Sequence, residues 1–500
     1  MTSARWAYAA LIAATLFAYR GSLQIGLVYD DHKVVANNPL IRGFDALPTY
    51  FSPDYYRFSG DPVHWRPVAT LSHLLVYQLG GLEPWVHHAA NLLLHLGNAL
   101  ALLWLLRRVV GRGAPALLGA LAFALHPAIS EAVLCVTFRR DALVLAGLFA
   151  SLACARAAAR AGGPAAAGWL ALLAVAQALA IGSKETAAVF PALVPLLVVW
   201  LAEPLDLAPA RARRTALAAA AVCAAAVGAY LAFRLHLEAR SAVLAGALPA
   251  PAFPERVALA VTHLRVYLQL LAVPWPLGLE RPSTWLGGGA ALATTLGALT
   301  CAALALAHLA PGARGRAALA WVLLPLLPVL VFVPGATAER YLYVPAGGFA
   351  LGVALGVAWL STHLPDRRWA VFATLPLLAL EARLVHHQVT AWREPITLWR
   401  QTAEHFPESF RTHVGLASEL ARAGELAEAE AHLRRALVLY PASDAALHGL
   451  AQVLGRRGDV AAAKRAFREL LARRPVDEAR VAEELAELLR NAHPGPRGGR

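Results

Sequence analysis

Apolar runs close to bilayer length recur from residue 6 to residue 386 and restrict the folds open to this chain. An α-helix needs about 20 predominantly apolar residues to cross the hydrocarbon core of a bilayer. Such runs occur at 6–19, 87–106, 115–134, 141–159, 164–181, 186–202, 214–233, 257–275, 287–309, 317–334, 343–361 and 369–386. Several are rich in Ala and Gly, which favours close helix packing. The sequence therefore predicts an all-α, polytopic membrane helix bundle with about 11–12 hydrophobic segments.

The composition agrees with a membrane protein and excludes the usual soluble domains. Hydrophobic residues make up 58% of the chain and charged residues only 15%, whereas soluble domains carry about 25% charged residues. The net charge of +13 is compatible with a nucleic-acid partner, but the arginines gather at the ends of the apolar runs and in the C-terminal helices. Topology and contact with phospholipid headgroups explain that placement better. We expect membrane lipid as a partner and no nucleic acid.

Positive charge at the ends of the runs predicts which side of the membrane each loop faces. Loops rich in arginine stay on the cytoplasmic side, and five such loops occur, around Arg107, Arg156, Arg211, Arg314 and Arg367. The N-terminus is then cytoplasmic, and the polar stretch 20–86 is an outer loop. The run at 6–19 lacks a clear small-residue cleavage site before Asp30, which favours a signal anchor over a signal peptide.

One interval between basic loops is inconsistent with simple crossing. Three runs lie between the loops at Arg214 and Arg314, where two cytoplasmic loops require an even number. We expect one of the three to be re-entrant or not a span at all, which leaves eleven spans. The chain then leaves the last span on the outer side.

The period of the sequence changes after Trp392. Pro407, Pro441 and Pro475 are spaced by thirty-four residues, and Gly415-Leu416 recurs at the same spacing as Gly449-Leu450. This period, with small residues where helices touch and Pro closing each unit, is typical of the tetratricopeptide repeat (TPR). We predict a TPR α-solenoid with full repeats at 408–441 and 442–475, after a half repeat containing Trp392 and Trp399.

Domain boundaries follow from these two patterns. The membrane domain occupies 1–388, and the TPR domain occupies 392–490 with a capping helix at 476–490. Residues 491–500 end in the sequence PGPRGGR, and we expect them to form a disordered tail.

Ionisable residues outside the basic loops gather at a few ends of apolar runs. The outer loop opens with the adjacent carboxylates Asp30 and Asp31. Three further groups follow, and they contain His126, Glu131 and Arg139; Lys184 and Glu185; and Glu339, Arg340 and Tyr341. The charge topology places all of them on the outer side. Ionisable groups near membrane depth are costly and usually functional.

Short motifs within these groups occur in a characteristic order. A YDD sequence follows the first run, and then come HP followed by EAV, SKE, ERYLYVP, a Trp-rich helix and the repeats. In this order, and over nearly the whole chain, they resemble the transmembrane and tetratricopeptide-repeat O-mannosyltransferases and their bacterial relatives. The resemblance implies a GT-C glycosyltransferase fold for residues 1–388 and the transfer of mannose or a similar hexose.

The resemblance also implies the chemistry of that transfer. The donor is a polyprenyl-phosphate-linked sugar, and the acceptor is a protein or a glycan on the outer face. An inverting transfer needs a carboxylate to accept the acceptor's proton, and we assign this role to Asp30 or Asp31, which the sequence does not separate. The leaving lipid phosphate needs cations nearby, and we assign Lys184 and Arg340, with Arg139 in reserve. Supporting or acceptor-binding roles fall to Glu131, Glu185, His126, Glu339 and Tyr341.

Cofactor, partner and location follow from the same resemblance. No cofactor is expected, and no divalent metal, because related polyprenyl-phosphate-using enzymes manage without one. The groove of the TPR solenoid offers a binding surface to a protein or peptide acceptor. Only three lysines occur among 45 Lys and Arg residues, which favours a bacterium. We therefore expect a bacterial inner membrane, with the active site and the repeats on the periplasmic side.

Each group of polar residues also has a purely structural interpretation. The acidic pair can be a solvated helix end, His126 with Pro127 a helix terminator, and Lys184 with Glu185 a loop ion pair; Arg340 with Glu339 can be an interfacial pair. His87, His88 and His95 recur at helical spacing, where packing is favoured because no further metal ligands can be placed. For the whole chain, a non-catalytic scaffold that binds partners through its repeats and a transporter of lipid-linked sugars are the alternatives.

Overall fold

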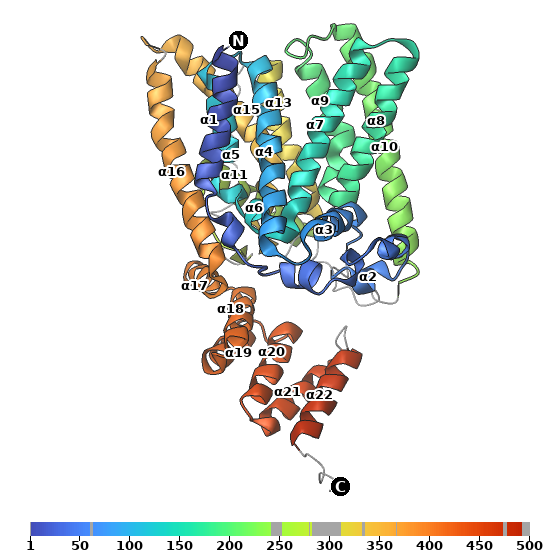
Figure 1. The fold of residues 1–500 in the computed structure, drawn as a ribbon, viewed down its shortest axis with the longest axis vertical. Coiled ribbons are helices and arrows are strands. Elements are labelled where there is room, and N and C mark those ends of the chain that lie inside the picture. Colours follow the sequence, from blue (N-terminus) through green and yellow to red (C-terminus); the bar gives the residue numbers. More distant parts are fainter. Residues whose placement is uncertain are drawn as a thin grey trace.

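The computed structural model describes residues 2–60, 64–241, 253–279, 281–282, 312–332, 336–366, 368–473 and 478–492. Long helices stand side by side in an upper bundle, and a curved chain of shorter helices lies below it (Figure 1). The bundle contains α1 (Thr2–Ala18), α4 (Pro84–Val109), α5 (Ala114–Ala124), α6 (Glu131–Leu134), α7 (Arg139–Arg160), α8 (Gly163–Ser183), α9 (Phe190–Trp200), α10 (Pro209–Glu238), α11 (Phe253–Ala272), α13 (Ala313–Leu323), α14 (Leu327–Phe332), α15 (Pro345–His363) and α16 (Arg368–Arg393). The predicted all-α class is confirmed. The only strands in the described ranges are two residues long, β1 (Arg281–Pro282) and β2 (Ala336–Thr337), which pair antiparallel.

The apolar runs form helices of membrane-spanning character. Within the described ranges, seven helices are long and apolar enough to cross a membrane, or eight if the bent pair Ala114–Ala124 and Pro127–Leu134 is one span. Each predicted run coincides with a helix or a broken helix, except 287–309, which lies outside the described residues. The predicted multi-pass character is confirmed. Which run between Arg214 and Arg314 is re-entrant stays a prediction.

The run at 115–134 is broken at Pro127. α5 and the segment Pro127–Leu134, which contains η5 (Pro127–Ile129) and α6, meet at a 47° bend. Proline has no N–H to donate to the preceding turn, so a helix ends before it. The His126 side chain caps the new turn, because its Nδ1 accepts a hydrogen bond of 3.3 Å from the Ala128 N–H.

The arginine-rich loops meet at one end of the bundle. Asp206, in the turn between α9 and α10, accepts from Arg108 of α4 at 2.7 Å and from Arg156 of α7 at 3.2 Å. Glu203 in the same turn pairs with Arg314 of α13 at 2.9 Å. This end also holds the N-terminus and is opposite the repeats (Figure 1). The basic loops therefore share one face, as the charge pattern predicts, and its assignment to the cytoplasm stays a prediction.

The predicted outer loop is a layer of short helices across the other end of the bundle. It contains η1 (Ser22–Gln24), η2 (His32–Ala36), η3 (Pro39–Ile41), η4 (Phe44–Phe51), α2 (Tyr55–Phe58) and α3 (Pro67–Gly80). Its aromatic polar groups bond within the layer: Trp65 Nε1 donates to Tyr50 O at 2.7 Å, and Tyr55 Oη lies 2.7 Å from Thr70 Oγ1. Bonds of this kind between its short helices make the stretch an ordered layer over the bundle.

The C-terminal helices repeat with the predicted period. They are α17 (Pro395–His405), α18 (Phe410–Ala423), α19 (Leu426–Leu439), α20 (Asp444–Arg456), α21 (Val460–Ala472) and α22 (Glu478–Ala492). Ser409 and Ser443, thirty-four residues apart, cap α18 and α20 by accepting from Thr412 N and Ala446 N. Gly424 and Gly458 follow these helices with φ of +88° and +85°, which glycine adopts without steric cost. The tail predicted at 491–500 lies outside the described residues from 493 onward.

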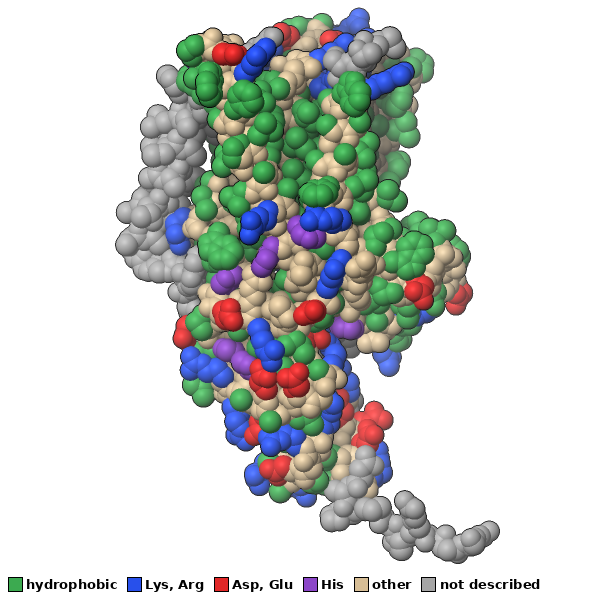
Figure 2. All heavy atoms as spheres, turned by 60° about the vertical axis from the view of Figure 1, so that its left-hand side comes forward, with side chains coloured by type: hydrophobic (Ala, Val, Ile, Leu, Met, Phe, Trp, Pro, Cys, Tyr) green, Lys and Arg blue, Asp and Glu red, His purple; other side chains and the backbone are tan. Residues whose placement is uncertain are grey.

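The surface changes character along the molecule. Figure 2 shows a mostly hydrophobic upper part above a lower part where acidic and basic side chains are mixed, with several Lys, Arg and His side chains between them. This division agrees with a bundle in lipid and a repeat domain in water.

Candidate active site

Asp31 is a buried hydrogen-bond acceptor that ties the outer loop to the turn before α7. Its side chain is fully buried. Oδ1 accepts from Thr137 N and from Thr137 Oγ1, both at 2.7 Å, and from Cys135 Sγ at 3.3 Å. Oδ2 accepts from Val28 N and Val136 N, both at 3.3 Å. With both oxygens used in this way, Asp31 has the surroundings of a structural carboxylate.

Asp30 has the opposite surroundings, although it is the adjacent residue. It is half-buried, and no residue in the described part of the chain donates a hydrogen bond to its carboxylate or forms an ion pair with it. Its backbone carbonyl accepts from Lys33 N and Val34 N at 3.1 and 3.0 Å, which starts η2. The structure thus separates two carboxylates that the sequence leaves equivalent.

Arg340 is held by Glu131 at two points. The guanidinium Nη1 donates to Glu131 Oε1 and the Arg340 N–H donates to Glu131 Oε2, each at 2.7 Å. The guanidinium carbon lies 4.3 Å from the centre of the Phe138 ring and 5.4 Å from that of Tyr341. The Arg340 side chain keeps 13% of its surface exposed, so the cation is fixed but not fully enclosed.

Lys184 also lies against the Tyr341 ring. Its Nζ is 4.2 Å from the ring centre and donates to Asp141 Oδ1 at 2.5 Å. Burial lowers the pKa of Lys184 to about 7, although Asp141 acts in the opposite direction. The predicted pair of cations, Lys184 and Arg340, is therefore brought together around one aromatic ring, a favourable arrangement for an aromatic face.

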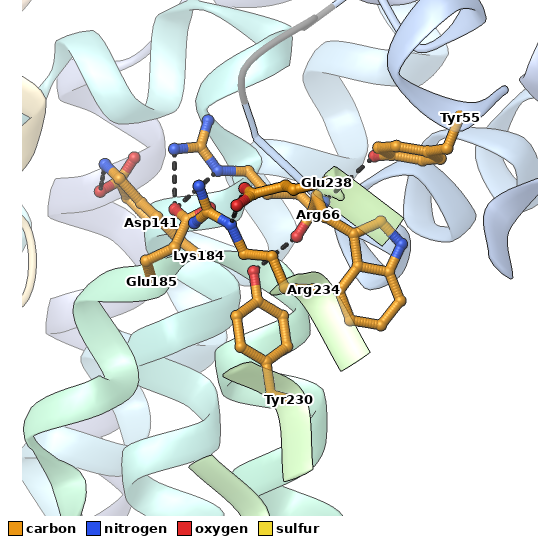
Figure 3. Close-up of polar contacts among 9 residues, drawn as sticks. Tyr55, Arg66, Asp141, Lys184, Glu185, Tyr230, Arg234 and Glu238 are labelled. Carbon is orange, nitrogen blue, oxygen red and sulfur yellow. Dashed lines mark hydrogen bonds and ion pairs between the residues drawn. The ribbon is translucent and has the colours of Figure 1, made fainter. Parts of the chain in front are cut away.

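Glu185 belongs to an adjoining cluster of ion pairs, which Figure 3 shows together with Lys184 and Asp141. Its Oε2 accepts from Arg66 Nη2 at 2.8 Å and Nε at 3.0 Å, and Oε1 lies 3.5 Å from Arg234 Nη1. Burial raises the pKa of Glu185, but Arg66 and His64 outweigh it and lower the pKa to about 2. Arg234 also donates to Glu238 at 2.6 Å within α10. Glu185 thus joins the start of α3 and α10 to the segment between α8 and α9.

Each nitrogen of Arg139 already donates a hydrogen bond within the protein. Its Nε donates to Asn91 Oδ1 at 2.7 Å, Nη1 to Ser72 O and Nη2 to His87 O, both at 3.1 Å. The side chain is buried. This arrangement joins α3, α4 and α7, and it makes Arg139 a structural residue beside Asp31.

His126 and Glu339 also act as ties between segments. Since His126 Nδ1 accepts from Ala128, its Nε2 carries the proton and donates to Leu271 O at 3.0 Å. Glu339 accepts from Gly278 N at 2.7 Å and from Arg281 Nη2 at 2.8 Å. Burial raises the pKa of Glu339 to about 7, against the effect of Arg281.

Three residues of this region were not predicted from the sequence as parts of a site. Phe138 lies beneath Arg340 and also meets the Tyr29 ring, with centres 6.1 Å apart. Arg66, at the start of α3, holds Glu185. Arg281 is fully buried, and its Nε and Nη1 have no partner among the described residues; nothing in the local sequence points to it.

The three histidines of α4 bond to the backbone or to a tyrosine. His87 meets Gly81 O, His88 meets Gly26 O, and His95 meets Tyr343 Oη and Ala124 O, at 2.8 to 3.1 Å. These are the packing contacts that the sequence favours over a metal site. In the parts of the chain that the structure covers, no group of three or more His, Cys, Asp and Glu side chains is placed to hold a metal ion.

The repeats add a groove close to these residues. It has a volume of about 560 Å³ and is lined by α18, α20 and α22 through residues that include Val414, Ser418, Arg422, Gln452, Arg456 and Glu484. The first helix of the solenoid, α17, reaches the outer loop, where the rings of Trp399 and Tyr29 lie 5.6 Å apart. The repeat domain therefore packs directly against the residue before Asp30.

Comparison with known sequences supports the prediction that the C-terminal helices are tetratricopeptide repeats. A tetratricopeptide-repeat family model matches residues 410–453. These residues cover α18, α19 and most of α20. The predicted TPR solenoid is confirmed.

Two curated relatives match different lengths of the chain. "Protein O-mannosyl-transferase tmtc2" of Xenopus laevis is 34% identical over 146 residues, which cover 27% of this chain and 17% of that protein. "Protein O-mannosyl-transferase Tmtc3" of Drosophila melanogaster is 27% identical over 516 residues, covering 85% of this chain and 54% of that protein. The chain thus spans about half the length of the second relative and less of the first.

One solved structure covers a similar share of the chain. It is the Archaeoglobus fulgidus oligosaccharyltransferase tethered with an acceptor peptide, which is 12% identical and has a TM-score of 0.39. The match covers 85% of this chain and 58% of that one. The resemblance indicated by the order of the sequence motifs is confirmed by the curated relatives: the chain is similar to protein O-mannosyl-transferases of the Tmtc group, over 85% of its length to the Drosophila protein and over 27% to the Xenopus protein.

Proposed function

We propose that this protein is a membrane glycosyltransferase that moves mannose or a similar hexose from a polyprenyl-phosphate-linked donor to a hydroxyl of a protein acceptor. The observation that carries the proposal is the contrast between the two carboxylates. Asp31 is fully used by internal hydrogen bonds, while Asp30 is half-buried and unbonded within the described ranges. The match to a protein named an O-mannosyl-transferase over 85% of the chain supports the same class of reaction.

Asp30 would act as the general base. As the acceptor oxygen bonds to the anomeric carbon, its proton passes to the Asp30 carboxylate, and the bond between that carbon and the phosphate oxygen breaks. The electron pair of this bond leaves with the polyprenyl phosphate, and attack from the opposite face inverts the configuration. A base must lie within hydrogen-bond reach of the proton it accepts, and an unbonded carboxylate can meet that condition without first losing an internal partner.

Arg340 would bind the leaving phosphate, with Lys184 as the second cation of the site. A guanidinium keeps its charge at all physiological pH values and presents several donors to phosphate oxygens. Glu131 fixes Arg340 at two points, so the guanidinium is oriented before the charge on the phosphate develops. Lys184 is buried beside Asp141 and lies against the Tyr341 ring. Its positive charge would act on the phosphate without direct contact. Arg139 has no role in this scheme beyond structure.

The repeats would present the acceptor on the same side of the membrane. The TPR domain lies at the end of the bundle opposite the basic loops, and its first helix contacts Tyr29, the residue before Asp30. If those loops are cytoplasmic, this end faces the periplasm of a bacterial inner membrane. We propose no cofactor and no divalent metal for the transfer.

Transfer of radiolabelled mannose tests the proposal. Membranes carrying the parent protein, Asp30→Asn or Asp31→Asn would be supplied with polyprenyl-phosphate mannose and acceptor protein. We expect transfer by the parent and a loss of about 10²–10⁴-fold in Asp30→Asn at an unchanged protein level. Equal transfer by Asp30→Asn and the parent would refute the assignment of the base. Failure of the parent across several donor sugars and acceptors would refute the transferase itself.

A further inference from the structure

Tyr29, the residue before Asp30, has a backbone conformation that residues with a side chain rarely adopt. Its φ is +55°, and among the described non-glycine residues only Asp206 shares a positive φ. Residues held in such regions cluster at functional sites and persist where the surrounding structure fixes them. This unusual turn sets the direction in which the Asp30 side chain projects from the backbone.

Two aromatic rings hold Tyr29 in place. The centres of the Phe138 and Tyr29 rings lie 6.1 Å apart, and their planes make an angle of 67°. The centres of the Trp399 and Tyr29 rings lie 5.6 Å apart, with an angle of 59° between the planes. Phe138 comes from the turn that also binds Asp31, and Trp399 comes from α17. Edge-on and tilted aromatic contacts of this kind are favourable and directional. The turn is therefore fixed from the membrane domain on one side and from the repeats on the other.

Trp399 is itself packed against the first full repeat. Its side chain is 3% exposed, and a Cβ added to Gly415 of α18 would overlap its indole ring. The residue before Gly415, Val414, lines the TPR groove, as do Ser418 and Arg422 on later turns of the same helix. A continuous line of packed groups thus runs from the groove through Gly415 and Trp399 to Tyr29.

Two further contacts hold the segment around α17 against the membrane domain. Arg393, at the end of α16, donates from Nε and Nη2 to Gly21 O at 3.2 and 3.1 Å. His405, at the end of α17, lies 2.9 Å through Nδ1 from Leu277 O. Both ends of the segment that carries Trp399 are bonded to the membrane domain, so Trp399 is a fixed support.

We propose that Trp399 is a positioning residue for sugar transfer, which holds Tyr29 and through it the direction of the Asp30 carboxylate. The repeat domain then has a second role beyond binding the acceptor, because it completes the geometry of the base. This inference rests on the proposed function for its effect on rate, and on packing alone for its effect on the turn.

Steady-state kinetics would test the effect on rate. We expect Trp399→Ala to lower kcat by about tenfold or more, since small misplacements of a catalytic group are costly, while KM for the lipid donor changes less than twofold. Trp399→Phe should restore most of the rate, and Gly415→Ala should lower kcat as Trp399→Ala does. Trp369→Ala is the matched control, because Trp369 lies in α16 and is 62% exposed. Equal kcat in Trp399→Ala and Trp369→Ala would overturn the proposal.

Hydrogen–deuterium exchange would test the effect on the turn without relying on activity. Amides of residues 28–36 should exchange faster in Trp399→Ala than in the parent and be unchanged in Trp369→Ala. If the parent transfers no sugar but exchange changes as expected, the proposed function fails and the support of the turn by Trp399 stands. If transfer occurs but exchange in this segment is the same in all three proteins, the positioning role fails and the transferase stands.

Discussion

Thr137 donates two hydrogen bonds of 2.7 Å to a single oxygen of Asp31, one from its backbone N–H and one from its hydroxyl. The two residues are 106 positions apart in the chain, and both are buried. The contact joins the outer loop to the turn before α7. Because Asp30 is the preceding residue, this contact also fixes the place of the proposed base.

Thr137→Val should destabilise the protein by about 1.5–3 kcal/mol, the usual contribution of a hydrogen bond to a charged group. Valine has nearly the same shape but cannot donate to Asp31 Oδ1. Thr137→Ser keeps the hydroxyl and should stay closer to the parent. Thermal unfolding of the purified proteins in detergent measures the difference. Identical stability of the Val and Ser variants would show that the hydroxyl contributes nothing.

Arg340→Lys should raise KM for the lipid donor by about tenfold or more, although the charge is retained. A lysine has no planar fork of donors, so it cannot bind Glu131 and a phosphate oxygen in the same fixed geometry. Glu131→Gln should have a similar effect, because it removes the charge that orients Arg340. Initial rates at varied donor concentration give KM. An Arg340→Lys variant with parental KM would exclude Arg340 as a phosphate ligand.

Glu339 should make the folded protein less stable as the pH rises from about 4.5 to about 7. Its pKa in the folded protein is raised from 4.5 to about 7, chiefly by burial. The folded state therefore binds more protons than the unfolded state in this window. The contribution of Glu339 to the free energy of unfolding is fully present below pH 4.5 and is lost as the pH rises through 7. The total is on the order of 3 kcal/mol. Glu339→Gln stays neutral, so its unfolding curves at pH 5 and pH 7.5 should lie closer together than those of the parent.

Gly424→Ala and Gly458→Ala should each destabilise the repeat domain by about 1 kcal/mol and by similar amounts. Both glycines follow the first helix of a repeat with φ near +85°, where a Cβ is unfavourable. No atom lies within 4 Å of a Cβ built at either position, so the cost comes from the backbone alone. Chemical unfolding followed by circular dichroism measures it. Gly97→Ala, at an ordinary helical position of α4, serves as the control without such a cost.

Several features of the site were predictable because they depend on local sequence. The polar groups at Asp30, Lys184 and Arg340 interrupt apolar runs, and a charge in such a place needs a reason. Their presence at one end of the bundle follows from the lengths of the runs between them. The TPR period and its glycines were visible for the same reason, since a repeat is a pattern along the chain.

Other features depend on contacts between distant residues and left no local signal. Asp30 and Asp31 look alike in the sequence, and Arg139 looks like a phosphate ligand until Asn91 and two backbone carbonyls occupy its nitrogens. His126 could have faced a substrate, but its Nε2 bonds to Leu271 O. In each case the partner is tens of residues away or more.

The sequence by itself determined the membrane bundle, the grouping of its basic loops and the repeat domain, because hydrophobic length, charge and period act locally. Only the tertiary structure decided which carboxylate has no hydrogen-bond partner among the described residues, how Lys184 and Arg340 share the Tyr341 ring, and that Trp399 packs against Tyr29. The physical reason is that the state of an ionisable group is set by its burial and its partners. Those partners come from segments that meet only when the chain is folded.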